Sequence, residues 1–114
     1  ARMILVSDSG RCCGMADGST FCLGGQTAKL ENGIAKLPDG TIACSAINLY
    51  QGMVNAIAFG IPKEDAIRAA TYNPACAIGA ETLIGSIETG KIADFLVCAP
   101  DFSLKQVFLA GNEV

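Results

Sequence analysis

A short apolar run at residues 4–6 leads to a single carboxylate, Asp8, and this feature constrains the fold most. Such a run is typical of a buried strand, and an acid that follows a strand is presented at the mouth of a sheet, where a loop admits substrate. By the residues alone, Asp8 is also suited to a helix cap or a turn. The chain has no histidine (His 0), so Ser7 and Ser9 have no imidazole to activate them as nucleophiles.

The next segment is rich in turn residues. Residues 10–25 contain five glycines and are expected to form a loop, with Gly24-Gly25 as a turn. Residues 26–30 and 33–37 are joined through Asn32-Gly33, a pair that tolerates the positive φ angles of a tight hairpin turn. A second turn is expected at Pro38-Asp39-Gly40.

The hydrophobic period then changes to that of a helix. Apolar residues recur at intervals of three and four from residue 46 to residue 57, with Ser45 as the expected cap and Gly60 as the expected end. A second helix is expected from Pro62, with an apolar side over residues 66–70, and Asn73-Pro74 should end it and begin a short third helix. Residues 81–114 predict a small antiparallel sheet in which Asp94 has a structural role at a strand start. The fold class is therefore mixed α/β.

Composition narrows the class of protein. The chain of 114 residues is 51% hydrophobic and 17% charged, with a net charge of −3 and a mean hydropathy of +0.41. Scattered cations argue against nucleic-acid binding, and no run is long enough for a membrane span. The excess of apolar surface predicts either an interface between subunits of a homo-oligomer or a piece of a larger protein. The six cysteines (Cys 6) show no C-x-x-C spacing and predict reduced thiols in a cytoplasmic protein.

Several blocks of the sequence together resemble the carboxyl-terminal part of an amidohydrolase-superfamily enzyme, over nearly the whole chain. The blocks near residues 64–75 and 85–97 are general to the superfamily, whereas residues 23–45 narrow the resemblance to the sugar-phosphate deacetylases. The matching pieces are Val6-Ser7-Asp8, Leu23-Gly24-Gly25, residues 38–45, residues 64–75, Gly85-Ser86-Ile87 and residues 90–97.

The resemblance implies a fold and a reaction. Residues 1–80 would supply the last strand and closing helices of a (β/α)8 barrel with an inserted hairpin, and residues 81–114 would belong to a small β-sandwich. A water on a divalent metal, zinc or iron, would attack the acetamide of an amino-sugar phosphate, N-acetylglucosamine 6-phosphate. Asp8 would take a proton from that water and deliver it to the leaving nitrogen. Ile42, Ala43 and Cys44 would lie beside the sugar, although Cys44 stands where the family usually has glycine.

The metal ligands implied by the resemblance, a glutamate and two histidines on earlier strands, are not in this sequence. We therefore expect a carboxyl-terminal fragment, inactive alone, that begins at Ala1 without a cap. Two alternatives stay open: part of another amidohydrolase, dihydroorotase-like or imidazolonase-like, and a non-catalytic domain whose apolar faces bind a partner chain.

Overall fold

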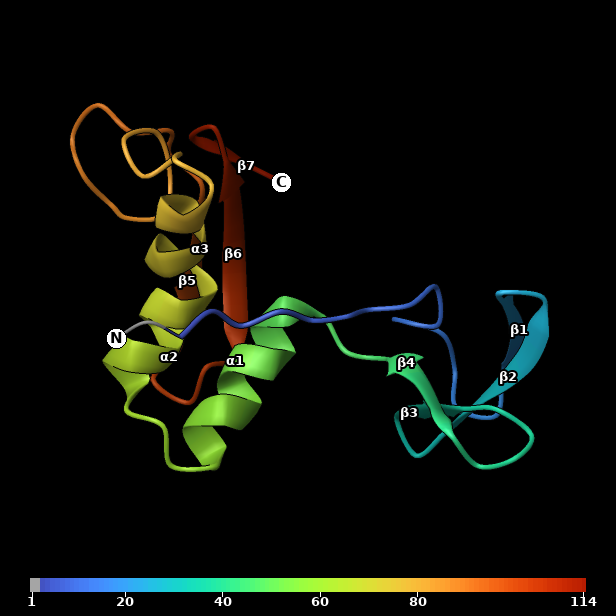
Figure 1. Cartoon of the computed structure of the whole chain (residues 1–114). Coiled ribbons are helices and arrows are strands. Elements are labelled where there is room, and N and C mark those ends of the chain that lie inside the picture. Colours follow the sequence, from blue (N-terminus) through green and yellow to red (C-terminus); the bar gives the residue numbers. More distant parts are fainter. Residues whose placement is uncertain (1–2) are drawn as a thin grey trace. The chain divides into compact units, whose positions relative to one another are not determined.

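The computed structural model describes residues 3–114 and divides the chain into two compact units (Figure 1). We call Val6–Gly52 the strand unit, and Met53–Val114 with the residues up to Leu5 the helical unit. The uncapped start expected at Ala1 lies outside the described residues. In chain order the elements are β1 (Thr20–Leu23), β2 (Gln26–Glu31), β3 (Ile34–Lys36), β4 (Ile42–Ser45), α1 (Leu49–Ala58), α2 (Lys63–Ala70), α3 (Tyr72–Ala77), β5 (Phe95–Cys98), β6 (Leu104–Leu109) and β7 (Asn112–Glu113).

The strand unit contains an antiparallel sheet in the order β1-β2-β3-β4. The expected hairpin between β2 and β3 is confirmed, and Asn32 and Gly33 have φ angles of 52° and 73°, as a type I′ turn requires. The expectation of a loop throughout residues 10–25 is wrong in part, because β1 pairs with β2 across Gly24-Gly25. The expected turn at Gly24-Gly25 is confirmed, because these two glycines have φ angles of 56° and 83° and close a second tight hairpin.

The predicted strand over residues 4–8 is not formed. Among the described residues, this stretch has no strand ladder, and the only pairing next to it is a parallel bridge between Ser9 and Ser45. The main chain is held instead by single contacts, since the Leu5 N–H donates to the Ala69 carbonyl at 2.9 Å. The Asn73 side chain also donates to the Met3 carbonyl at 2.7 Å. An apolar run forms a strand only where another strand pairs with it, and β5 pairs with β6 rather than with this stretch.

The three helices follow the expected order with one displaced start. The cap of α1 is Asn48 and not Ser45, because the Asn48 Oδ1 accepts the Gln51 N–H at 2.8 Å and Ser45 ends β4. Gly60 closes the helix as expected, with φ of 97° and its N–H donating to the Ile57 carbonyl. On the expected apolar side of α2, Ala66 and Ala69 are buried but Ile67 is exposed.

The tail forms the expected antiparallel sheet, in the order β5-β6-β7. Residues 81–94 lie outside its strands. The expected structural role of Asp94 is confirmed, because its carboxylate accepts the Ala110 N–H at 2.7 Å beside the β6–β7 turn. Phe95 and Phe108 are partners in register and their rings stack, with centroids 4.5 Å apart.

The mixed α/β class is confirmed, and each unit has a small core. Exposed apolar side chains are present on both, among them Val6 at 80%, Phe59 at 86% and Ile87 at 87% exposure. The expected excess of apolar surface is therefore present. No helix among residues 3–114 has the length and apolar character that a bilayer crossing requires. The expected boundary between barrel and sandwich segments at residues 80 and 81 stays a prediction.

Candidate active site

The carboxylate of Asp8 stands at a bend of the main chain in the strand unit. The residue has a φ of 47°, a left-handed conformation that Asp and Asn adopt more readily than other non-glycine residues. Its side chain is exposed. An accessible acid at a bend can meet a substrate, which is the first requirement for a proton-transfer group.

Ser45 at the end of β4 fixes the backbone around Asp8. The Ser45 N–H donates to the Asp8 carbonyl at 3.1 Å, and the Gly10 N–H donates to the Ser45 carbonyl at 3.0 Å. The two bonds enclose Ser9, which forms the parallel bridge to Ser45. The acid and β4 are thus joined directly, although they are far apart in the sequence.

The three expected sugar-contacting residues lie on β4, next to this bridge. Ile42 is 67% exposed, whereas Ala43 and Cys44 are half-buried. On β3, Lys36 pairs with Ile42 and the adjacent Ala35 pairs with Cys44, so Ala43 is the extra residue of a β-bulge. Bulges leave one residue out of the ladder and are frequent beside active sites. This position suits the expectation that backbone groups contact the sugar.

The side chain of Cys44 points into the interior of the strand unit. Its sulfur packs directly on Gly10, where a Cβ atom would collide with it. It also lies 3.7 Å from the sulfur of Cys12, which is completely buried. Sequence reasoning missed Gly10 and Cys12 as neighbours of the site.

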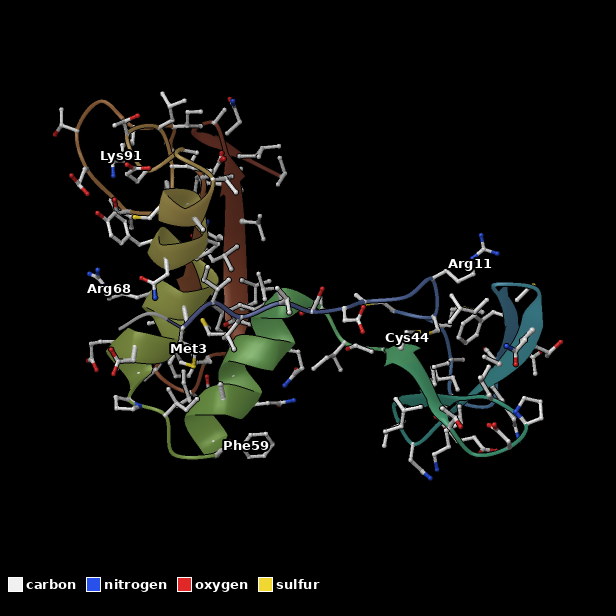
Figure 2. All side chains as sticks on the ribbon, viewed as in Figure 1. Met3, Arg11, Cys44, Phe59, Arg68 and Lys91 are labelled. Atoms are coloured by element: carbon white, nitrogen blue, oxygen red, sulfur yellow. The ribbon has the colours of Figure 1, made fainter. Side chains whose placement is uncertain are left out.

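The surroundings of Cys44 raise the pKa of its thiol above the usual value. Burial is the main cause, followed by the hydrogen bond and charge interaction with Cys12, and the negative charge of Asp8 adds a smaller contribution. Arg11 does not compensate, since its side chain extends away from Cys44 to solvent (Figure 2). The thiol of Cys44 is thus a poor nucleophile at neutral pH, and the carboxylate of Asp8 is the better candidate for chemistry.

The described residues do not by themselves provide a metal centre. Within residues 3–114, no three histidine, cysteine or acidic side chains come together as metal ligands. One carboxylate and one thiol are too few ligands to hold zinc or iron. The metal that the resemblance implies therefore does not fit the side chains in this part of the chain.

A hollow of about 470 Å³ lies over the sheet of the strand unit and does not include the candidate residues. Two lysines, Lys29 and Lys36, line it together with Glu31. Lys91, labelled in Figure 2, belongs to the helical unit, where its ammonium group contacts the Ser86 hydroxyl at 2.5 Å and the Glu88 carboxylate at 3.1 Å.

Comparisons with known proteins place this chain in a family. The model of the Amidohydrolase family matches residues 1–114. N-acetylglucosamine-6-phosphate deacetylase of Vibrio furnissii is 32% identical over 115 residues, which cover all of this chain and 29% of that protein.

Solved structures agree with the sequence comparison. The crystal structure of N-acetylglucosamine-6-phosphate deacetylase from Pasteurella multocida matches with a TM-score of 0.89 and 32% identity, over 97% of this chain and 29% of that one. A variant of the Mycobacterium smegmatis enzyme in complex with N-acetyl-D-glucosamine-6-phosphate matches with a TM-score of 0.83 and 31% identity, over 96% of this chain and 30% of that one. The chain thus spans less than a third of these relatives, and it belongs to the amidohydrolase family.

Proposed function

We propose that this chain supplies the proton-transfer acid and part of the sugar site of an N-acetylglucosamine-6-phosphate deacetylase. The observation that carries the proposal is the juxtaposition of the exposed Asp8 with the bulged strand β4, within a chain similar to such enzymes along its whole length. Parts of other amidohydrolases would share Asp8. The resemblance over residues 23–45, which include β4, favours the deacetylases.

In the proposed reaction a water attacks the acetamide carbonyl of N-acetylglucosamine 6-phosphate. Asp8 accepts the proton that the water loses as its oxygen bonds to carbon. When the carbon–nitrogen bond breaks, the same carboxyl group returns that proton to the leaving nitrogen. The products are acetate and glucosamine 6-phosphate, and Asp8 ends the cycle as the carboxylate with which it began.

The strand β4 would hold the sugar so that its acetamide faces Asp8. Backbone groups at Ala43 are the best placed, because this residue lies outside the ladder with β3. The side chain of Ile42 is free to cover an apolar face of the ring, while Cys44 faces inward. The complete enzyme would act as a cytoplasmic homo-oligomer with a (β/α)8 barrel, and the zinc or iron would be held by residues outside this part of the chain.

The first test is an assay of the purified chain with zinc and N-acetylglucosamine 6-phosphate. We expect no release of acetate, because one carboxylate does not constitute a metal-assisted hydrolytic site. Robust turnover by the chain alone would contradict the proposal that it supplies only part of the site.

The second test is a chimera in which this chain replaces the matching region of the Vibrio furnissii relative. Asp8→Asn should lower kcat by about 10²- to 10⁴-fold, since asparagine keeps the backbone conformation but cannot accept the proton. Asp17→Asn is the matched control, because Asp17 is another exposed acid of the strand unit and accepts a hydrogen bond from the Gly33 N–H at 3.3 Å. An active chimera that loses as much activity with Asp17→Asn as with Asp8→Asn would refute the role of Asp8.

A further inference from the structure

We propose that Cys12 and Cys44 are an oxidative modification site, at which two-electron oxidants such as hydrogen peroxide form a reversible disulfide. The two residues are 32 positions apart in sequence, yet their sulfur atoms lie 3.7 Å apart in the core of the strand unit. The inference is independent of the proposed deacetylase reaction.

Backbone hydrogen bonds hold the segments that carry Cys12 and Cys44 next to each other. Gly10 bonds to the Ser45 carbonyl, directly after Cys44, and the turn that follows Gly10 carries Cys12, whose carbonyl accepts the Met15 N–H. A disulfide has a sulfur–sulfur bond of about 2.05 Å, so the sulfur atoms must approach by roughly 1.6 Å. Rotation of two side chains over a glycine can supply such a shift, and Gly10 leaves the space that any larger residue would fill.

Burial decides the order in which the two thiols react. Cys12 has no exposed surface, whereas Cys44 is half-buried and is the thiol that a small oxidant can reach. The Cys44 thiolate attacks one oxygen of hydrogen peroxide and releases hydroxide, which leaves a sulfenic acid. The Cys12 sulfur then displaces the hydroxyl group from that sulfenic acid. In total, two thiols and one peroxide give one disulfide and two waters.

The raised pKa of Cys44 determines how the reaction depends on pH. Because burial, Cys12 and Asp8 all disfavour the thiolate, little of the reactive form exists at neutral pH. Oxidation should therefore be slow near pH 7 and accelerate as the pH rises.

The cross-link would join the turn that follows Asp8 to β4, the strand expected to contact the sugar. It would also connect two parts of a very small core, which contains Phe21, Ala28 and Ala35 besides Cys12. Small units with little apolar burial gain most from such a covalent link. The strand unit would then be more stable when oxidised.

The test uses the whole chain with Cys13, Cys22, Cys76 and Cys98 replaced by serine. Treatment with hydrogen peroxide should remove two hydrogens from the intact mass, and dithiothreitol should restore them. The rate should increase with pH, and the melting temperature of the oxidised form should rise on the order of 10 °C. Oxygen addition to the two sulfurs without loss of hydrogens would overturn the proposal.

A matched variant retains Cys13 and Cys44 and carries Cys12→Ser. Cys13 is adjacent in sequence but exposed, so its cross-linking to Cys44 should be at least about tenfold slower than that of Cys12. Equal rates would show that the segment has no fixed geometry and would refute the site. If the multiple variant does not fold, peptide mapping of the oxidised wild-type chain gives the answer, since the proposal requires Cys12–Cys44 and not Cys13–Cys44 or Cys22–Cys44 linkages.

Discussion

The two units of the molecule achieve close packing by different means. In the helical unit the buried residues are mainly alanines, such as Ala66, Ala69 and Ala75, and the helix backbones themselves come near other groups. In the strand unit the core is formed by side chains of the short strands, such as Phe21, together with Cys12 from a turn.

This difference predicts how each unit tolerates added volume. A flexible side chain can move or be shortened to make room, whereas a helix backbone cannot. Each unit has one glycine that would collide if it carried a Cβ atom, Gly85 in the helical unit and Gly10 in the strand unit. Substitutions at these two positions therefore test the comparison directly.

Gly85→Ala should have the largest effect. An added Cβ atom would lie 2.7 Å from the Ala75 Cβ, 3.1 Å from the Tyr72 Cα and 3.2 Å from the Thr71 carbonyl oxygen, so two of the three obstacles are backbone. The φ of 93° also strains any other residue. We expect a loss of about 3 kcal/mol in the free energy of unfolding, measured by urea denaturation of the helical unit.

Gly90→Ala is the control for that experiment. Gly90 has nearly the same φ, 92°, but no atom lies near its added Cβ. The free energy of unfolding of this variant should fall by only about 1 kcal/mol, the cost of placing alanine at a positive φ. Equal losses at Gly85 and Gly90 would mean that the helical unit is not closely packed at Ala75.

Gly10→Ala should lower the free energy of unfolding by a smaller amount, about 2 kcal/mol, because the main obstacle is the sulfur of Cys44. A second substitution that removes this sulfur should reverse the loss. In the double variant with Cys44→Ala, the sulfur is gone and most of the loss should be recovered. A double-mutant cycle by urea denaturation measures this coupling. Strictly additive losses would show that Gly10 and Cys44 do not pack together and would remove the contrast between the two units.

Asn48→Ala should cost about 1 kcal/mol, because it removes the side chain that accepts the Gln51 N–H at the start of α1. Ser45→Ala should cost less, since the Ser45 hydroxyl accepts only a longer bond, 3.3 Å, from the Ile47 N–H. Helix content from circular dichroism and the urea midpoint of both variants provide the measurement. The reverse ranking would restore Ser45 as the cap.

The smallest expected effect is the loss of stability at acid pH when a turn carboxylate is protonated. This loss should be similar in the two units. The pKa of Asp39 in the strand unit is lowered from 3.8 by the Thr41 N–H, and the pKa of Asp101 in the helical unit is lowered from 3.8 by the Ser103 N–H. A carboxylate whose pKa is lowered by folding stabilises the folded state at pH values above its pKa in the unfolded state. That stabilisation is lost as the pH falls through its pKa in the folded state.

Asp39→Ala and Asp101→Ala should therefore be less stable than the wild type at pH 6. The difference should shrink as the pH falls below 3.8 and through the lowered pKa of each wild-type carboxyl group. Urea midpoints at pH 6 and at a series of acid pH values measure it. A difference that persists at low pH would show that the charge of these acids is not what stabilises their turns.

The sequence predicted correctly those turns and helices that depend on residues close together in the chain. Asn32-Gly33 fixes a hairpin through its own backbone angles, and the helical spacing from Leu49 onward fixes α1 within a few residues. The cap was misplaced because Ser45 and Asn48 are both good caps, and only the partner strand decides that Ser45 belongs to β4. The strand expected at residues 4–8 failed for a related reason, since an apolar run forms a strand only beside neighbours to pair with.

The candidate site was predictable only in part. Asp8 is visible in the sequence because it ends an apolar run, and its proximity to β4 agrees with the grouping of Asp8 and residues 42–44 by family resemblance. The contact of Cys12, Gly10 and Cys44 depends on a parallel bridge between segments that are distant in the sequence, and no sequence spacing predicts it.

The left-handed backbone at Asp8 limits which acid can serve there. Aspartate, with its short side chain, is favoured at a φ of 47°, whereas glutamate gains no local hydrogen bond in this conformation and would carry its oxygen atoms about one carbon–carbon bond farther out. Asp8→Glu thus retains the charge while altering both reach and backbone preference. At this bend the main chain by itself favours the shorter of the two acids.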